Sequence, residues 1–301
     1  MLLISLTICF GALNIARVFL IKDFLMKVFF SALTLFCFFT FKAKSQYYFN
    51  DIVAQKIAQK QYMALKNNHV TKVRATSYEN TNTPVNDFML EQDISPDAKT
   101  ITIHSSYPSS GSTVTITQYE NDKPVKTYDS SGNVVTTTSY VYDDEGRLKT
   151  ISTQTDDAFM DSHSHEVHQW FYDNGTPSYM LRIKDNADTT NIRFIKDEEG
   201  NIGQENWIKK GRTIESYYYY FNDKNELTDI VRYNSRAKKM LPDFLYEYAA
   251  NGRVNQMTQM PAGSSDYMIW KYVYNDKGLK QKELLYNKQN QLIGRIEFQY
   301  Q

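Results

Sequence analysis

The chain has 301 residues, with 34 Lys and Arg against 34 Asp and Glu, 42% hydrophobic residues and 12 glycines. The balanced charge argues against a dedicated nucleic-acid-binding protein, because such proteins carry a basic surface for phosphate groups. The hydrophobic content argues against a fully disordered chain, and the few glycines exclude a collagen-like one. None of these quantities indicates a particular chemistry.

Residues 1–45 form a leader that differs from everything after it. They hold both cysteines and nine of the 17 phenylalanines. Within the leader, residues 26–45 begin with Met-Lys, continue with an apolar core over residues 28–41, and end in Ala-Lys-Ser before Gln46. A basic start, an apolar core and a small-x-small end are the three parts of a secretory signal peptide. We therefore predict an exported protein that is cut before Gln46.

A second apolar stretch, residues 2–21, lies upstream of this signal. One interpretation is that the true start is Met26 and that the preceding residues are a gene-start error. The alternative is a membrane-tethered envelope component, which residues 2–21 would anchor with residues 28–41 as a second segment. Residues 46–301 contain no cysteine, so after removal of the leader the fold must depend on packing and sheet hydrogen bonds.

Residues 46–99 are expected to form one helix and an irregular connection. Asn50 can cap a helix from Asp51 to about Lys66, with Asp51 in its first turn. We expect this helix to cover one end of the sheet that follows, and a helix for binding a partner is the alternative. The composition of residues 79–97, rich in Asn, Thr, Asp and Pro, predicts the irregular connection.

From about residue 100 the sequence alternates with a period of two. Met268, Trp270, Tyr272 and Tyr274, for example, fall on one face of an extended segment. Alternation with many Thr, Tyr and Val residues is typical of half-buried strands. The sequence predicts an all-β antiparallel meander of hairpins over residues 100–301, with roughly 14 to 16 strands.

A five-residue turn frame recurs through this region. In Tyr142-Asp143-Asp144-Glu145-Gly146 an aromatic residue precedes Asp, and Gly comes last. The Asp side chain can bond to the backbone two residues on, and the Gly adopts the left-handed conformation that ends a hairpin turn. The frame returns with variations at residues 128–132, 196–200, 221–225, 248–252, 274–278 and 286–290, and in shortened form at 172–175. A looser class of turn lies between these frames.

The stretch from Tyr140 to Leu148 resembles the tyrosine-aspartate (YD) repeat of the Rhs family. A degenerate form of the repeat extends over about residues 120–300. In this largely bacterial family the repeats build strips of antiparallel sheet that can wrap into a shell around a toxin, and this chain has too few repeats for a shell. The resemblance implies a repeat protein of the bacterial cell envelope, located in the periplasm, on the outer surface or in the medium.

An open sheet of this many strands must curl or close, because twist accumulates and exposed edges invite aggregation. We expect a curled strip or a barrel-like wrap, and the sequence leaves the choice between them open. An outer-membrane barrel is a weaker alternative, since its outward faces should be apolar over about ten residues.

No catalytic motif of a hydrolase or nucleotide-binding protein is present, and three histidines form the one cluster with metal-ligating chemistry. His163, His165 and His168 lie within six residues, with Asp161 just before them. On an extended chain His163 and His165 share one side, while Glu166 and His168 share the other. A weak transition-metal site of His163, His165, His168 and Asp161 is one hypothesis. The alternative is a polar segment with solvated histidines, and no cofactor is expected.

Aromatic residues offer the second candidate site. All 23 tyrosines and all three tryptophans follow the leader. Tyr217, Tyr218, Tyr219 and Tyr220 are consecutive, so an extended strand would direct two rings to each face, and Trp270 is a further candidate. Amphipathic rings suit sugar stacking and wet interfaces. The alternative is that they fill half-buried strand positions.

These observations favour an exported non-enzymatic scaffold or binding protein that presents a repetitive β surface to glycan or protein. The expected partners are a glycan or an envelope protein, with no nucleic acid, and a membrane only through a retained leader. A metal-dependent enzyme centred on His163, His165 and His168 is the alternative of another class, and a membrane-tethered envelope component is a third.

Overall fold

The computed structural model describes residues 46–107, 111–234, 237–261 and 266–301. The leader, with its predicted signal peptide and the alternative membrane anchor, lies outside these residues. No helix in the described part of the chain is long and apolar enough to cross a membrane.

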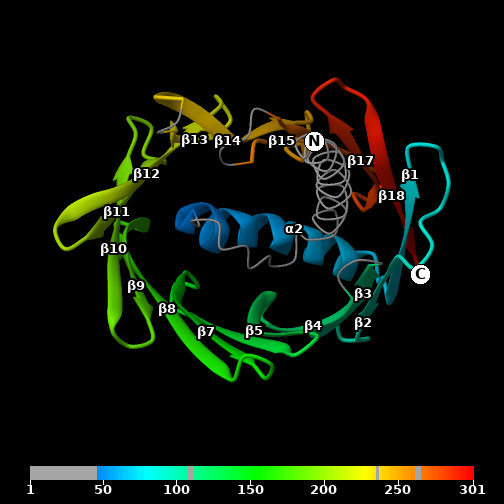
Figure 1. The fold of residues 1–301 in the computed structure, drawn as a ribbon, viewed down its shortest axis with the longest axis horizontal. Coiled ribbons are helices and arrows are strands. Elements are labelled where there is room, and N and C mark those ends of the chain that lie inside the picture. Colours follow the sequence, from blue (N-terminus) through cyan, green and yellow to red (C-terminus); the bar gives the residue numbers. More distant parts are fainter. Residues whose placement is uncertain (1–45, 108–110, 235–236, 262–265) are drawn as a thin grey trace, which may run out of the picture.

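The described residues form an 18-stranded antiparallel sheet that closes into a barrel, because β18 pairs with β1 (Figure 1). Every strand pairs with its neighbours in sequence, as in a meander. The strands are β1 (Lys72–Glu79), β2 (Met89–Ile94), β3 (Thr100–Tyr107), β4 (Gly111–Glu120), β5 (Lys123–Ser131), β6 (Val134–Tyr142), β7 (Leu148–Asp157), β8 (Ser162–Asp173), β9 (Thr176–Lys184), β10 (Asp188–Lys196), β11 (Ile202–Lys209), β12 (Arg212–Phe221), β13 (Leu227–Asn234), β14 (Lys239–Tyr248), β15 (Val254–Gln259), β16 (Met268–Tyr274), β17 (Lys280–Asn287) and β18 (Leu292–Tyr300). The all-β antiparallel meander predicted from the sequence is confirmed, and of the two open alternatives the structure is the closed one.

The seam of the barrel lies between the two ends of the sheet. β1 and β18 are in register from Val73 opposite Tyr300 to Glu79 opposite Gly294. The sequence predicted neither β1 nor β2, and the expectation of an irregular connection over residues 79–97 is wrong where β2 lies. β1 has one large aliphatic residue, and in β2 the polar run from Glu91 to Asp93 interrupts the apolar positions, so the alternation that identifies a half-buried strand is faint in both.

The inner face of the barrel is apolar and rich in aromatic rings. Its main core consists of buried residues from β6 to β18: Tyr140, Leu148, Ile151, Trp170, Met180, Ile192, Phe194, Ile202, Trp207, Tyr217, Tyr219, Leu227, Ile230, Tyr246, Met257, Trp270, Tyr272, Leu285 and Ile296. Neighbouring residues in each strand point outward, as the period of two requires. The predicted grouping of Trp270 with Tyr272 on one face is confirmed.

The N-terminal helix lies inside the barrel and crosses the ring (Figure 1). It begins as the π-helical segment η1 (Tyr48–Val53) and continues as α2 (Ala54–Asn67). The expectation that it covers one end of the sheet is wrong, because the apolar inner face of so wide a ring needs a filling, and the helix supplies it. Asn50 is not its cap: it lies within η1, where its backbone N–H donates to the carbonyl of Gln46.

The turn frames have the predicted geometry at one end of the barrel. In the turn between β6 and β7, Asp143 Oδ1 accepts from the backbone N–H of Glu145 at 3.1 Å and of Arg147 at 2.8 Å. Gly146 has a φ of +75°, in the left-handed region. The frame at residues 128–132 was wrong: Tyr128 lies inside β5, and a two-residue turn after Ser131 connects it to β6.

Four frame tyrosines, and Tyr300 at the end of the last strand, also bond their strands to the preceding repeat. The hydroxyl of Tyr172 donates to the carbonyl of Leu148 at 2.7 Å, and Leu148 follows the Gly146 turn by two residues. Arg147 stacks on the same Tyr172 ring, 4.8 Å from its centroid. The same hydroxyl bond joins Tyr142 to Pro124, Tyr248 to Leu227, Tyr274 to Val254 and Tyr300 to Lys280. This series of tyrosine-to-carbonyl bonds fixes successive hairpins in register.

Candidate functional site

A fully buried carboxylate binds the start of the lumen helix to the barrel wall. Glu205 of β11 accepts four hydrogen bonds. Its Oε1 accepts from Tyr47 N at 3.0 Å and Trp207 Nε1 at 2.6 Å, and its Oε2 accepts from Tyr48 N at 2.9 Å and the Tyr219 hydroxyl at 2.7 Å. Burial raises the pKa of Glu205, and the four donors oppose that rise by stabilising the ionised form.

A second carboxylate holds the residue before the helix. Asp243 of β14 accepts from Gln46 Nε2 at 2.9 Å and from Arg232 Nε of β13 at 2.9 Å. Burial raises the pKa of Asp243, and the Arg232 guanidinium opposes this rise. Gln46 is therefore fixed inside the barrel by a strand almost 200 residues later in the chain.

A chain of charged groups on β8 and β9 fixes the first helical turn. Asp51 of η1 accepts from His168 Nδ1 at 2.6 Å and from Trp170 Nε1 at 3.2 Å, both on β8. His168 Nε2 contacts Glu166 at 2.9 Å, and Glu166 pairs with Arg182 of β9 at 2.5 Å. Burial alone would lower the pKa of His168, but Asp51 and Glu166 raise it to about 9. Burial would raise the pKa of Glu166, but His168 and Arg182 lower it to about 2.

The predicted metal ligands do not converge. His163 pairs with Asp156 on β7 and is 75% exposed, His165 contacts Ser152, and His168 faces Asp51 in the lumen. Side chains of β8 alternate between the two faces, as predicted. His168 and Glu166 therefore point into the lumen, while His163 and His165 point outward. Among the described residues no group of three or more His, Cys, Asp or Glu side chains could hold a metal ion, and this includes the proposed set with Asp161.

The far end of the helix is bound by the turn between β4 and β5. Asp122 accepts from the hydroxyl of Tyr62 at 3.2 Å and forms an ion pair with Lys66. The Lys66 ammonium is the main reason why the pKa of Asp122 is lowered. The Tyr62 ring stacks on Tyr119 of β4 with centroids 4.1 Å apart. The lumen helix is thus held at both ends.

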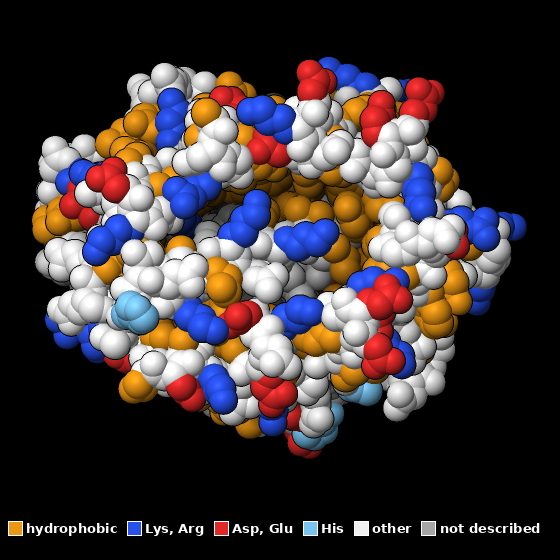
Figure 2. Space-filling model, turned by 180° about the vertical axis from the view of Figure 1, so that it is seen from behind, with side chains coloured by type: hydrophobic (Ala, Val, Ile, Leu, Met, Phe, Trp, Pro, Cys, Tyr) orange, Lys and Arg blue, Asp and Glu red, His pale blue; other side chains and the backbone are white. Residues whose placement is uncertain are grey.

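The helix fills the lumen only in part. Figure 2 shows the hollow of the barrel with hydrophobic side chains on its walls and Lys and Arg side chains across it and around its rim. Lys56 and Lys60 of α2 are exposed, whereas Tyr62 on the same helix is buried. The helix therefore presents one charged, solvated side and one side packed on the wall.

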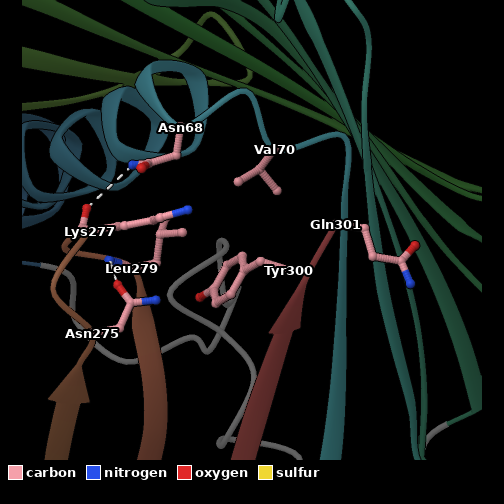
Figure 3. A pocket seen from close by; sticks show the side chains of 7 residues that line it. All are labelled: Asn68, Val70, Asn275, Lys277, Leu279, Tyr300 and Gln301. Atoms are coloured by element: carbon pink, nitrogen blue, oxygen red, sulfur yellow. Dashed lines mark hydrogen bonds between the residues drawn. The ribbon is translucent and has the colours of Figure 1, made fainter.

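A pocket of about 340 Å³ lies beside the end of α2 (Figure 3). It is lined by Asn68, Val70, Asn275, Lys277, Leu279, Tyr300 and Gln301. Three of the polar side chains that line it are bonded within the protein: Asn68 Nδ2 donates to the carbonyls of Ala64 and Lys277, Asn275 Oδ1 accepts from the backbone N–H of Leu279, and the Tyr300 hydroxyl donates to the carbonyl of Lys280. The pocket is a gap between the helix end and the barrel rim.

The consecutive tyrosines of β12 divide between the two faces, as predicted. Tyr217 and Tyr219 face the lumen, with 0% and 2% of their surface exposed, and Tyr219 donates to Glu205. Tyr218 and Tyr220 face outward, and Tyr220 is 52% exposed. Trp270 is 4% exposed in the inner core. Of the five candidate ligand-binding residues, only Tyr218 and Tyr220 face the outside of the barrel. The prediction was wrong for Tyr217, Tyr219 and Trp270, which are buried in the core.

Neighbouring strands extend these two rings into a surface, which we call the outer tyrosine surface: Tyr218, Tyr220, Val231, Tyr233 and Met240. Tyr218 lies opposite Val231 of β13, and Tyr233 lies opposite Met240 of β14. Tyr233 is 55% exposed. Three hydrogen-bonded polar side chains adjoin this surface. Asn206 Oδ1 accepts from Gln204 Nε2 at 2.9 Å and from the Ser216 hydroxyl at 2.6 Å. Gln204 lies directly opposite Tyr218.

Glu205 was the main residue that the sequence reasoning missed. A carboxylate in a strand is most simply interpreted as an outward, solvated side chain. The signal that could have found it is parity, because Glu205 is two residues before Trp207 and so shares its face. The same spacing relates His168 to Trp170.

Comparison with known proteins gives likeness in structure alone. No family model matches the chain, and no curated protein matches it. A porin-like protein from Bacteroides uniformis has 9% identity and a TM-score of 0.37, with 77% of this chain and 98% of that chain covered. A porin-like protein from Bacteroides vulgatus has 13% identity and a TM-score of 0.26, with 77% and 99% covered.

A third solved structure is the Photorhabdus luminescens Tc holotoxin pore. It has 9% identity and a TM-score of 0.32, and the match covers 71% of this chain and 12% of that chain. Values this low extend no property of these three proteins to this chain.

Proposed function

We propose that the chain is an exported, non-enzymatic binding protein of the bacterial envelope that presents the outer tyrosine surface to a glycan. The observation that carries the proposal is the division of the β12 tyrosines. Tyr217 and Tyr219 are buried in the core beside the lumen helix, while Tyr218, which is half-buried, and Tyr220, which is exposed, lie on the outer face. The leader predicted from the sequence supports export.

The chemistry of the surface favours glycan over protein. A sugar presents an apolar ring face that stacks on an aromatic ring and hydroxyl groups that bond to polar side chains beside it. The outer tyrosine surface offers both, since Tyr218 and Tyr220 are accompanied by Gln204 and Asp229 on the adjoining strands. A protein partner would more often require an apolar centre of charge-depleted residues.

The repeat itself supports a relationship to the YD repeat of the Rhs family, which we keep as part of the proposal. The aromatic residue, the turn Asp or Asn and the final Gly or Asn each have a defined contact in this barrel. A common physical role for the three positions is what such a relationship requires.

The test is a polysaccharide panel against the purified full chain, followed by calorimetry on each ligand found. We expect Tyr218→Ala/Tyr220→Ala to raise the Kd at least tenfold, which corresponds to about 1.4 kcal/mol. The Tm should remain almost unchanged, because exposed side chains contribute about 0.5 kcal/mol or less to stability.

The matched control is Tyr128→Ala/Tyr179→Ala, which removes two outward tyrosines of similar exposure on other strands. It should leave the Kd unchanged. Equal affinities for the wild type and both double variants would sink the proposed binding surface. A defined envelope protein bound in place of any polysaccharide, with sensitivity to the β12 pair, would change the ligand class to protein.

A further inference from the structure

The first residues of the lumen segment are buried among carboxylates. Gln46 is 7% exposed and donates through Nε2 to Asp243. The next two backbone N–H groups, of Tyr47 and Tyr48, each donate to one oxygen of Glu205. The backbone nitrogen of Gln46 precedes these two donors directly, and the free N–H groups at the start of a helix point in the same direction.

Glu205 has the hydrogen-bond pattern of an ionised group. Each of its two oxygens accepts two hydrogen bonds, so a carboxylic acid proton on it would displace one of the donors. All four donors are neutral: two backbone amides, an indole and a phenol. A buried carboxylate without a cation is costly in free energy. The partial positive charge of the helix start compensates for only part of one charge.

Of the two carboxylates that bind residues 46–48, one has a bonded cation among the described residues and the other has none. Glu205 and Asp243 are both buried carboxylates, and Arg232 is the cation bonded to Asp243. In the uncut chain the nitrogen of Gln46 is a neutral peptide amide. After a cut before Gln46 the same nitrogen becomes an ammonium group, which would balance the second carboxylate.

We infer that the α-ammonium group of Gln46, released by removal of the leader, is a structural cation of the lumen and the counter-ion of Glu205. Cleavage then does more than release the chain from a membrane: it supplies the charge that completes the anchor of the lumen helix. The inference depends on the predicted cut and is independent of the glycan proposal.

This arrangement has a chemical consequence that can be measured. A free N-terminal Gln cyclises when its neutral α-amine attacks the side-chain amide carbon, which forms a ring C–N bond and releases the side-chain nitrogen as ammonia. An ammonium group that the negative charge of Glu205 keeps protonated has no lone pair for the attack, and the bond to Asp243 fixes the side-chain amide. The folded barrel should therefore protect Gln46 from becoming pyroglutamate.

The experiment expresses the full precursor with export in a bacterial host and determines the N-terminus of the purified protein by mass spectrometry. We expect Gln46 as the first residue, with a free amine. On incubation, the N-terminal peptide should lose the mass of ammonia at least tenfold more slowly in the folded protein than in urea.

A variant separates the ion pair from folding in general. Glu205→Gln should accelerate cyclisation toward the rate in urea, while Glu199→Gln, an exposed carboxylate in the turn before β11, should not. If Glu205→Gln fails to fold, the comparison of folded and urea-treated wild type still decides. A different first residue, a mature N-terminus found already cyclised, or equal cyclisation rates in the two states would each overturn the inference.

Discussion

At the residue scale, His168 shows how position within a strand decides the role of a side chain. Three histidines lie within six residues of β8, and only His168 faces the lumen. There it lies between Asp51 and Glu166, whose negative charges raise its pKa to about 9 despite its burial. The group is therefore a permanent cation at neutral pH that holds the first turn of the lumen helix.

The pH dependence of stability follows from these shifts. The folded pKa of His168 is above its unfolded value, so its contribution is complete below about pH 6.5 and is lost as the pH rises through 9. The folded pKa of Glu166 is below its unfolded value, so its contribution is present above about pH 4.5 and is lost as the pH falls toward 2. Both contributions to stability are therefore complete between about pH 4.5 and pH 6.5.

We predict that His168→Gln removes most of the pH dependence between pH 6.5 and 9. The shift of His168 corresponds to about 3 kcal/mol of stability. Urea unfolding of wild type and variant at pH 6 and pH 9 measures this difference. His163→Gln removes an exposed histidine whose pKa Asp156 also raises, so it should reduce the slope far less than His168→Gln; equal slopes for the two variants would contradict the assigned role of His168.

At the element scale, the repeat is a unit of register. An Asp or Asn closes most of the frame turns, and a tyrosine hydroxyl then bonds to the carbonyl two residues beyond the preceding turn. The arginine after the turn lies over the next tyrosine ring and shields that bond. A slip of one residue would break all of these contacts at once and would exchange the inner and outer faces of the strand.

We predict that Tyr248→Phe destabilises the barrel by about 1 kcal/mol, the usual net contribution of one buried hydrogen bond. The hydroxyl donates to the carbonyl of Leu227 at 2.7 Å, and burial raises the pKa of Tyr248 to about 12. At this chain length the Tm should fall by about 2–4 °C, measured by calorimetry. Tyr233→Phe changes an exposed ring and should have no effect; the same loss in both variants would remove the distinction between frame and surface tyrosines.

The sequence predicted these elements in part, and the failures have physical causes. Strong alternation, as in Met268 to Tyr274, identified the strands from residue 100 onward. It could not identify β1, where Val73 is the one large aliphatic residue. The helix was predicted close to its observed bounds, but its place was not, because an apolar helix face is the same whether it covers a sheet from outside or fills a barrel.

The candidate site was predictable to a similar degree. The period of two predicts that one tyrosine pair, Tyr217 with Tyr219 or Tyr218 with Tyr220, faces outward. To decide which pair it is, one must know which face of the strand is buried. That choice depends on Glu205 and Trp207 of the neighbouring strand, which no local pattern connects to Tyr219. The separation of His163 from His168 was visible in the same period.

At the scale of the whole molecule, the seam is what makes the sheet a barrel. β1 is paired on both sides, with β18 along seven residue pairs and with β2 along four. Without that closure the sheet would have two free edges, which attract other chains. The lumen helix would then lose the wall that surrounds it.

We predict that Ala75→Pro opens the seam. Ala75 lies opposite Phe298 of β18 and Leu90 of β2, so it is enclosed by a strand on either side, and a proline there cannot donate the N–H that a residue in a paired strand supplies. The Tm should fall by several degrees, and oligomers should appear in light scattering as edges pair between molecules. Asp144→Pro, at a turn position that proline favours, is the matched control and should remain a monomer of wild-type stability. A monomeric, stable Ala75→Pro protein would show that the seam is dispensable.

The seam also has a kinetic consequence. It joins Val73 to Tyr300, so the contact that completes the ring forms between the first and last strands of the sheet and cannot form until β18 has been synthesised. Contacts of such long sequence separation make folding slow, because the chain entropy lost on closure is not repaid until late. During that interval the lumen helix, which emerges first, gives the growing sheet an apolar surface on which to collect its inner face.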